Sequence, residues 1–100
     1  MKVVSTHEFS NWYDKTTLRE KAQVDARIAR IEENDHLGDW KYISDGLAEL
    51  RWKNGRRIYF AKLKDKIILL LIGRYKNVQK KNLKEARALL RRYADFESQR

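Results

Sequence analysis

The sequence predicts one domain of the α+β class. Helical apolar spacing occupies the first third of the chain and its last quarter, whereas the middle alternates between apolar and charged residues with a period of two. An unbroken apolar run at residues 67–72 adds a strand that we expect to be covered on both faces. The 100 residues contain no proline and four glycines, and no stretch has the composition of a linker, so we expect a single domain over residues 1–100.

The chain starts with a short segment, Lys2–Val4, whose β-branched residues favour a first strand. Ser5 and Glu8 follow at the spacing of a capping box, with Val4 and Phe9 placed as a hydrophobic staple. These signals predict a short helix after Ser5. Its apolar face contains Phe9, Trp12 and Tyr13.

A second capping box, made by Thr17 and Glu20, predicts a longer helix that ends near Asn34. Its inward residues share helical spacing and are Leu18, Val24, Ile28 and Ile31. The two helices would form a helical hairpin, and a turn-rich loop over residues 36–39 follows it.

Alternation from Leu47 onward predicts two strands joined near Asn54-Gly55. A two-residue turn there would mix apolar and charged side chains on both faces. A three-residue loop over residues 53–55, with Gly55 in the left-handed conformation, instead pairs Leu50 with Ile58 and leaves one face apolar. We therefore predict the three-residue loop.

A tight turn at Lys64-Asp65 leads into the central strand, Lys66–Gly73. After a loop over Gly73–Asn77, apolar spacing predicts a last helix. Its inward residues are Leu83, Ala86, Leu90 and Tyr93. Its outer face is basic and contains Lys80, Lys81, Lys84, Arg87, Arg91 and Arg92.

The net charge of +9 makes polyanions the expected partners, whether nucleic acid, the ribosome, an acidic protein or a membrane surface. The chain has no cysteine, which excludes disulfides and thiolate metal sites and is compatible with a reducing compartment. The first residues lack the apolar core of a signal peptide, and the longest apolar run is far shorter than the roughly 20 residues of a membrane span. We therefore expect a cytoplasmic protein without a membrane partner.

The predicted loop places Arg51 opposite Arg57, and Glu49 opposite Tyr59, on the polar face of the hairpin. Like charges directly opposite each other on neighbouring strands are unfavourable. Two arginines held side by side are explained if their planar guanidinium groups bind an anion such as phosphate. The alternative is that they turn apart into solvent or pair with Glu49 and other acids. Both interpretations stay open.

Other chemistries have weaker support in the sequence. His7 and His36 lack the spacing of a metal pair or of a nucleophile's base, so we expect ordinary surface histidines, no metal site and no cofactor. Gly73 stands alone rather than in a phosphate-binding glycine loop. Trp12 and Trp40 could stack on bases, although such residues are more often part of the core or its rim.

Five motifs occur in order along the chain. They are Gly38-Asp39-x-Lys41, Gly46-Leu47-x-Glu49-Leu50-Arg51, Gly55-x-Arg57-Ile58-Tyr59-Phe60, Leu69-Leu70-Leu71-x-Gly73 and Lys76-x-x-Gln79-Lys80-Lys81. With them the chain resembles the RelE/ParE toxin superfamily, and within it the addiction module killer proteins, over residues 9–93. The resemblance implies a βααβββα chain with a small, mostly antiparallel sheet packed against the helical hairpin.

The resemblance also implies the toxin of a type II toxin–antitoxin system. RelE-type members cut translated mRNA at the ribosomal A site, without a metal, by attack of the RNA 2′-hydroxyl on the adjacent phosphorus. ParE-type members instead inhibit DNA gyrase, and a catalytically decayed nucleic-acid-binding module is a further alternative. The implied partners are mRNA, the ribosome and a cognate antitoxin of the helix-turn-helix type, encoded adjacently, through which alone the toxin would meet operator DNA.

Matching the family's motifs onto this chain assigns Arg51, Arg57 and Lys76 as catalytic. The expected RNA-binding residues are Lys41, Lys53, Arg56, Tyr59, Arg74, Tyr75, Gln79 and Lys80. The chain departs from the subgroup in two places, because it has Gly73-Arg74-Tyr75-Lys76 where Gly-Gly-Asp-Lys is typical, and Asn82 where an aspartate is usual. These departures make the expected site more basic.

Overall fold

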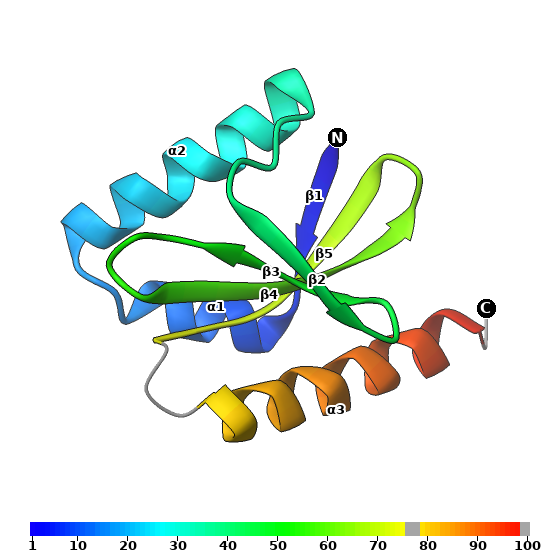
Figure 1. Cartoon of the computed structure of the whole chain (residues 1–100). Coiled ribbons are helices and arrows are strands. Elements are labelled where there is room, and N and C mark those ends of the chain that lie inside the picture. The colour runs from blue at the N-terminus through cyan, green and yellow to red at the C-terminus, as the bar shows by residue number, and fades with distance from the viewer. Residues whose placement is uncertain (76–78, 99–100) are drawn as a thin grey trace.

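The computed structural model describes residues 1–75 and 79–98, and Figure 1 shows its elements. They follow in the order β1 (Lys2–Ser5), α1 (His7–Asp14), α2 (Leu18–Asn34), β2 (Trp40–Ser44), β3 (Leu47–Arg51), β4 (Arg56–Lys64), β5 (Ile67–Tyr75) and α3 (Gln79–Ser98). The strands form one sheet in the order β1-β5-β4-β3-β2. β1 is parallel to β5 and the other neighbours are antiparallel. The predicted α+β class with a mostly antiparallel sheet is confirmed.

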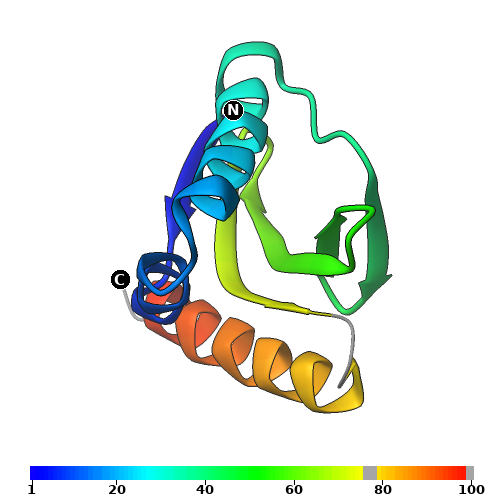
Figure 2. The same ribbon diagram turned by 90° about the vertical axis from the view of Figure 1, so that its left-hand side faces the viewer.

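Each face of the sheet has its own core. Figure 2 shows the helices α2 and α3 on different sides of the strands. On one face α1 and α2 contribute Phe9, Val24 and Ile31 to a cluster with residues from all strands except β2. On the other face α3 contributes Ala86 and Leu89. The central strand β5 serves both cores, with every residue from Ile68 to Ile72 buried. This burial confirms the prediction from its unbroken apolar run.

The hairpin of β3 and β4 has the predicted register. Leu50 lies opposite Ile58, and Arg51 lies opposite Arg57. Gly55 closes the loop at φ 97°, a left-handed conformation that favours glycine, and its amide donates to the Trp52 carbonyl at 3.1 Å. The choice of a loop that keeps one face apolar was therefore correct.

The strand β2 was not predicted, so the expected layout lacks one edge strand. Asp45 and Gly46 join β2 to β3, with φ of 53° and 83° and with Ser44 paired to Leu47. Two positive φ angles in a two-residue loop are typical of a type I′ turn, for which Asp-Gly is a preferred sequence. That dipeptide was the signal that could have revealed β2.

The start of α1 differs from the prediction by one residue. Thr6, not Ser5, is the N-cap: its buried hydroxyl accepts from the Phe9 amide at 2.9 Å and donates to the Leu71 carbonyl at 2.6 Å. The predicted capping box with its staple is therefore wrong. Glu8, its expected second member, instead binds Arg92 of α3 at 2.7 Å.

The predictions for α2 and the end of β5 had mixed outcomes. The Thr17–Glu20 capping box is present, and α2 ends at Asn34 as predicted. Leu18, expected inside, is 85% exposed because it lies in the first turn of the helix, outside the core contacts. β5 continues to Tyr75 rather than ending at Gly73, since Arg56 still pairs with Tyr75.

Candidate functional site

Three arginines lie in register across neighbouring strands. Arg51 on β3 faces Arg57 on β4, and Arg57 faces Arg74 on β5. We call this set the arginine row. It lies where β3 and β5 end and β4 begins, near the start of α3 (Figure 1), and the contact between Arg74 and Glu85 places it on the face that α3 covers.

The three guanidinium groups differ in their hydrogen-bond and ion-pair partners. Arg57 donates to the carbonyls of Trp52 and Arg56 at 3.3 and 3.0 Å, and its Nε lies 3.8 Å from Glu49. Arg74 binds Glu85 at 2.8 Å. The alternative that stayed open for Arg51 and Arg57, pairing with acids, thus holds for Arg57.

Arg51 is the exception. Its side chain is half-buried, and its Nε is enclosed without a hydrogen-bond partner among the described residues. A buried donor that lacks a partner costs roughly 1–3 kcal/mol unless something supplies an acceptor. An anion bound at the arginine row would offset the positive charge of the three neighbouring arginines.

Next to the arginine row, the residues paired across the neighbouring strands are Lys41, Glu49, Tyr59 and Ile72. Glu49 and Tyr59 were expected on a polar face, but they are 4% and 1% exposed because α3 packs over them. Burial, reinforced by the charge of Glu49, raises the pKa of the Tyr59 hydroxyl, while Arg57 acts in the opposite direction. Tyr59 is therefore a neutral hydroxyl packed in the α3 core rather than an exposed ring on the surface.

The predicted basic residues separate into two groups. Lys41 on β2, Lys53 in the β3–β4 loop and Lys80 on α3 are exposed, and the pairing of Lys41 with Glu49 places it on the face of the arginine row. Arg56 does not join them. It is 1% exposed on the opposite face, where it binds Gln23 at 2.9 Å.

The structure describes only the backbone of two further predicted site residues and does not describe a third. Tyr75 is the last residue of β5 and Gln79 the first of α3, and their side chains are outside the described part of the structure. Lys76 lies outside the described residues altogether. Sequence reasoning missed Glu85, although its place on a helix after Arg74 was visible, and it did not assign Glu49 to the site.

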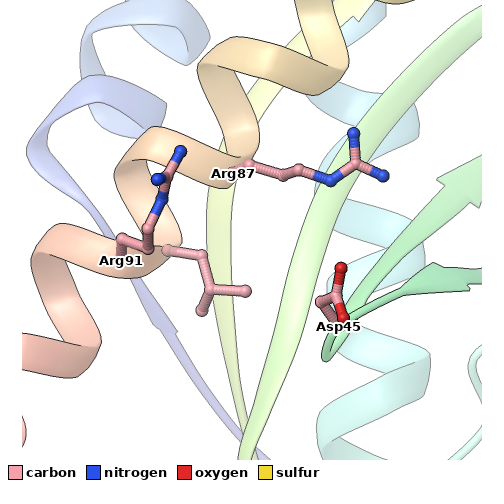
Figure 3. A pocket seen from close by; sticks show the side chains of 4 residues that line it. Asp45, Arg87 and Arg91 are labelled. Carbon is pink, nitrogen blue, oxygen red and sulfur yellow. The ribbon is translucent and has the colours of Figure 1, made fainter.

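A separate open pocket of about 510 Å³ lies between the β2–β3 turn and α3 (Figure 3). Asp45, Arg87, Leu90 and Arg91 line it. Arg87 donates to the hydroxyl of Ser44 at 2.7 Å. Because the turn precedes β3 and Arg51 ends it, the pocket and the arginine row lie at opposite ends of that strand.

No three His, Asp or Glu side chains gather into a possible metal site within residues 1–75 and 79–98. Across the same residues, no helix combines the length and the apolar character that a membrane crossing requires.

An uncharacterized protein of Haemophilus influenzae is 35% identical to this chain over 92 residues, which cover 89% of the chain and 92% of that protein. The chain belongs to the same family as this Haemophilus protein. No protein-family model matches the chain. The family membership therefore rests on this relative.

The fold has a counterpart among solved structures. A chain of the crystal structure of the RelB–RelE antitoxin–toxin complex from Methanococcus jannaschii is similar with a TM-score of 0.65, and the match covers 79% of this chain and 96% of that chain. Sequence identity is 11%, so this likeness shows a shared fold. The fold expected from the RelE/ParE resemblance is thereby confirmed, while the addiction module killer subgroup stays a prediction.

Proposed function

We propose that this protein is the toxin of a type II toxin–antitoxin pair and that it cuts translated mRNA at the ribosomal A site. The observation that carries the proposal is the arginine row, in which three arginines lie opposite one another on three neighbouring strands. The likeness to a chain of an antitoxin–toxin complex and the net charge of +9 support the same conclusion.

In the proposed reaction the RNA 2′-hydroxyl gives its proton to solvent water and its oxygen attacks the adjacent phosphorus, while the 5′-oxygen leaves and takes up a proton. The product is a 2′,3′-cyclic phosphate. Arg51 and Arg57 stabilise the charge that accumulates on the phosphorane oxygens, and Arg74 extends the same row. Lys76 acts as a further phosphate clamp or as the proton donor to the 5′-oxygen.

Glu49 has a supporting role in this mechanism. Its carboxylate lies 3.8 Å from Nε of Arg57, and both side chains are nearly enclosed, with exposures of 5% and 11%. Because the Arg57 amino nitrogen also donates to two carbonyls, the guanidinium plane is held before a substrate arrives. Preorganised donors stabilise a transition state more effectively than donors that must reorient.

The proposed partners are mRNA, the ribosome and a cognate antitoxin of the helix-turn-helix type encoded next to the toxin. Operator DNA is met through that antitoxin. Lys41, Lys53 and Lys80 are the exposed cations that would contact the RNA backbone around the arginine row.

The test is induced expression of the chain, followed by measurement of growth and mapping of mRNA 5′ ends. We expect growth arrest and new 5′ ends within translated codons, both lost in Arg51→Gln and Arg57→Gln. Arg19→Gln is the matched control, since Arg19 is an equally charged but exposed residue on α2. Unchanged mRNA cleavage in the Arg51→Gln and Arg57→Gln variants would refute the proposed site.

A second candidate is a protein that binds a target such as DNA gyrase without cutting RNA. The pairing of Arg57 with Glu49 and of Arg74 with Glu85 favours it, because such ion pairs also stabilise a fold without catalysis. Purified protein discriminates the two: the second candidate predicts blocked supercoiling with translated mRNA intact.

A further inference from the structure

The edge strand β2 presents two aromatic rings to solvent on the sheet face opposite the arginine row. Trp40 is 40% exposed and Tyr42 is 57% exposed. They are two residues apart on one strand and pair with Leu50 and Ala48, so both side chains project from the same face, and their backbone positions are about 6.6 Å apart along the strand. β2 is the last strand of the sheet, so nothing in the sheet lies beyond it.

Of the three tryptophans, Trp40 is exposed, whereas Trp12 and Trp52 are partly buried. Trp12 packs so closely over Gly73 that a Cβ at Gly73 would come within 2.5 Å of its ring. The guanidinium groups of Arg27 and Arg56 lie 4.6 and 5.5 Å from the centre of the Trp52 ring. Trp12 and Trp52 are thus engaged in contacts within the protein, whereas a large part of Trp40 is available to a ligand.

A contact with a neighbouring group holds each of the two rings in place. Trp40 contacts the buried ring of Phe60, with centroids 6.1 Å apart and planes at 60°. The hydroxyl of Tyr42 accepts a hydrogen bond from the Gly46 amide at 3.1 Å. Rings that are already fixed lose little conformational entropy when a ligand stacks on them.

Positive charge accompanies the rings. The ammonium group of Lys62 lies 5.8 Å from the centre of the Trp40 ring, and Lys62 is itself exposed. Lys41 stands between Trp40 and Tyr42 in the sequence and projects to the other face of the strand, on the side of the arginine row. We call Trp40, Tyr42 and Lys62 the edge platform.

We propose that the edge platform binds unpaired bases of single-stranded RNA, with Trp40 and Tyr42 stacking on bases and Lys62 contacting a phosphate. Fixed aromatic rings beside lysines match a ligand that combines flat apolar faces with a negatively charged backbone. A strand of RNA that crosses the β2 edge meets Lys41 on one face and the rings on the other. The inference deepens the proposed function, on which it rests for the identity of the ligand as RNA.

The test is binding of the whole chain to a fluorescent single-stranded 2′-O-methyl RNA, which cannot be cut by 2′-hydroxyl attack. Stacking of an aromatic side chain contributes about 1–3 kcal/mol per base, so Trp40→Ala and Tyr42→Ala should each weaken binding about 5- to 150-fold. Tyr42→Ala is the safer variant for the fold, because more of its ring is exposed. Leu18→Ala, which removes another exposed apolar side chain on a distant helix, should bind as the wild type does.

Two further readouts separate stacking from a structural role. Tryptophan fluorescence should be quenched by the single strand and not by duplex RNA, and Trp40→Phe should keep most of the affinity while losing the quench. Lys62→Gln should reduce the slope of log affinity against log salt by about 0.7, the value for one phosphate contact on a single strand.

The outcomes are separable from those of the proposed function. Wild-type affinity in Trp40→Ala and Tyr42→Ala overturns the edge platform, even if Arg51→Gln abolishes cleavage. Loss of an acidic protein partner in these two variants, with RNA affinity unchanged, also overturns it and assigns the surface to that protein. Weakened RNA binding in both variants, with Arg51→Gln still binding the single strand, supports the platform whether or not the chain cuts RNA.

Discussion

Replacement of Arg56 tests whether this buried arginine stabilises the fold rather than binding RNA. The sequence placed Arg56 among the RNA-binding residues, whereas the structure buries it beside α2. Its Nη1 donates to Gln23 at 2.9 Å, its Nη2 lies 3.6 Å from Glu20, and its guanidinium is 5.5 Å from the centre of the Trp52 ring. Arg56 therefore joins the β3–β4 hairpin to α2.

The expected loss of stability follows from these contacts. A buried hydrogen bond to a charged group contributes about 1.5–3 kcal/mol, and a desolvated contact between a cation and an aromatic ring about 1–2 kcal/mol. One term acts the other way, because Nε of Arg56 is enclosed without a partner among the described residues. We expect Arg56→Ala to lower the free energy of unfolding by about 3 kcal/mol, which for a domain of this size lowers Tm by about 10–20 °C.

The assay is urea and thermal unfolding followed by circular dichroism. Arg56→Met should cost less than Arg56→Ala, because its side chain keeps apolar contact with Trp52 and removes the enclosed polar group. Arg19→Gln is the control that removes the same charge from an exposed position. A loss below about 1 kcal/mol in Arg56→Ala, together with weaker RNA binding than in Arg19→Gln, would refute the structural role of Arg56.

Three further predictions concern the fold around the site. Gly73→Ala should lower the free energy of unfolding by about 1–3 kcal/mol, since its Cβ would meet the Trp12 ring at 2.5 Å, and a Trp12→Leu background should reduce that loss in a double-mutant cycle measured by urea unfolding. Thr6→Ala should cost about 1–2 kcal/mol because Thr6 caps α1, whereas Ser5→Ala should be close to neutral; equal losses would contradict the observed cap. The N-terminal ammonium, through a hydrogen bond and its charge, lowers the pKa of Asp35 below 3.8, so the carboxylate stabilises the fold above that pH and its contribution is lost as pH falls through the lowered pKa. Asp35→Asn should flatten that acid dependence in urea midpoints between about pH 2 and pH 6, and an unchanged profile would contradict the pairing.

Much of the candidate site was readable from the sequence because its geometry depends on local rules. Side chains alternate between the two faces of a strand, so Leu50 and Ile58 share the apolar face in only one β3–β4 register. That register places Arg51 opposite Arg57. The predictions from the Thr17–Glu20 capping box and from the apolar run of β5 rest on equally local signals and were also confirmed. Signals that depend on a few adjacent residues are largely independent of what packs against them.

The tertiary structure alone decided what covers each face. Alternation shows that Glu49, Tyr59 and Arg57 share a face, but not that α3 buries it, and it cannot show that Arg56 is buried against α2. Both facts depend on contacts between residues more than 20 positions apart, whose energies no short window of sequence contains. The sequence by itself therefore determined the β3–β4 register, the buried run of β5 and the charge of the site, and packing determined which arginines are available to a phosphate.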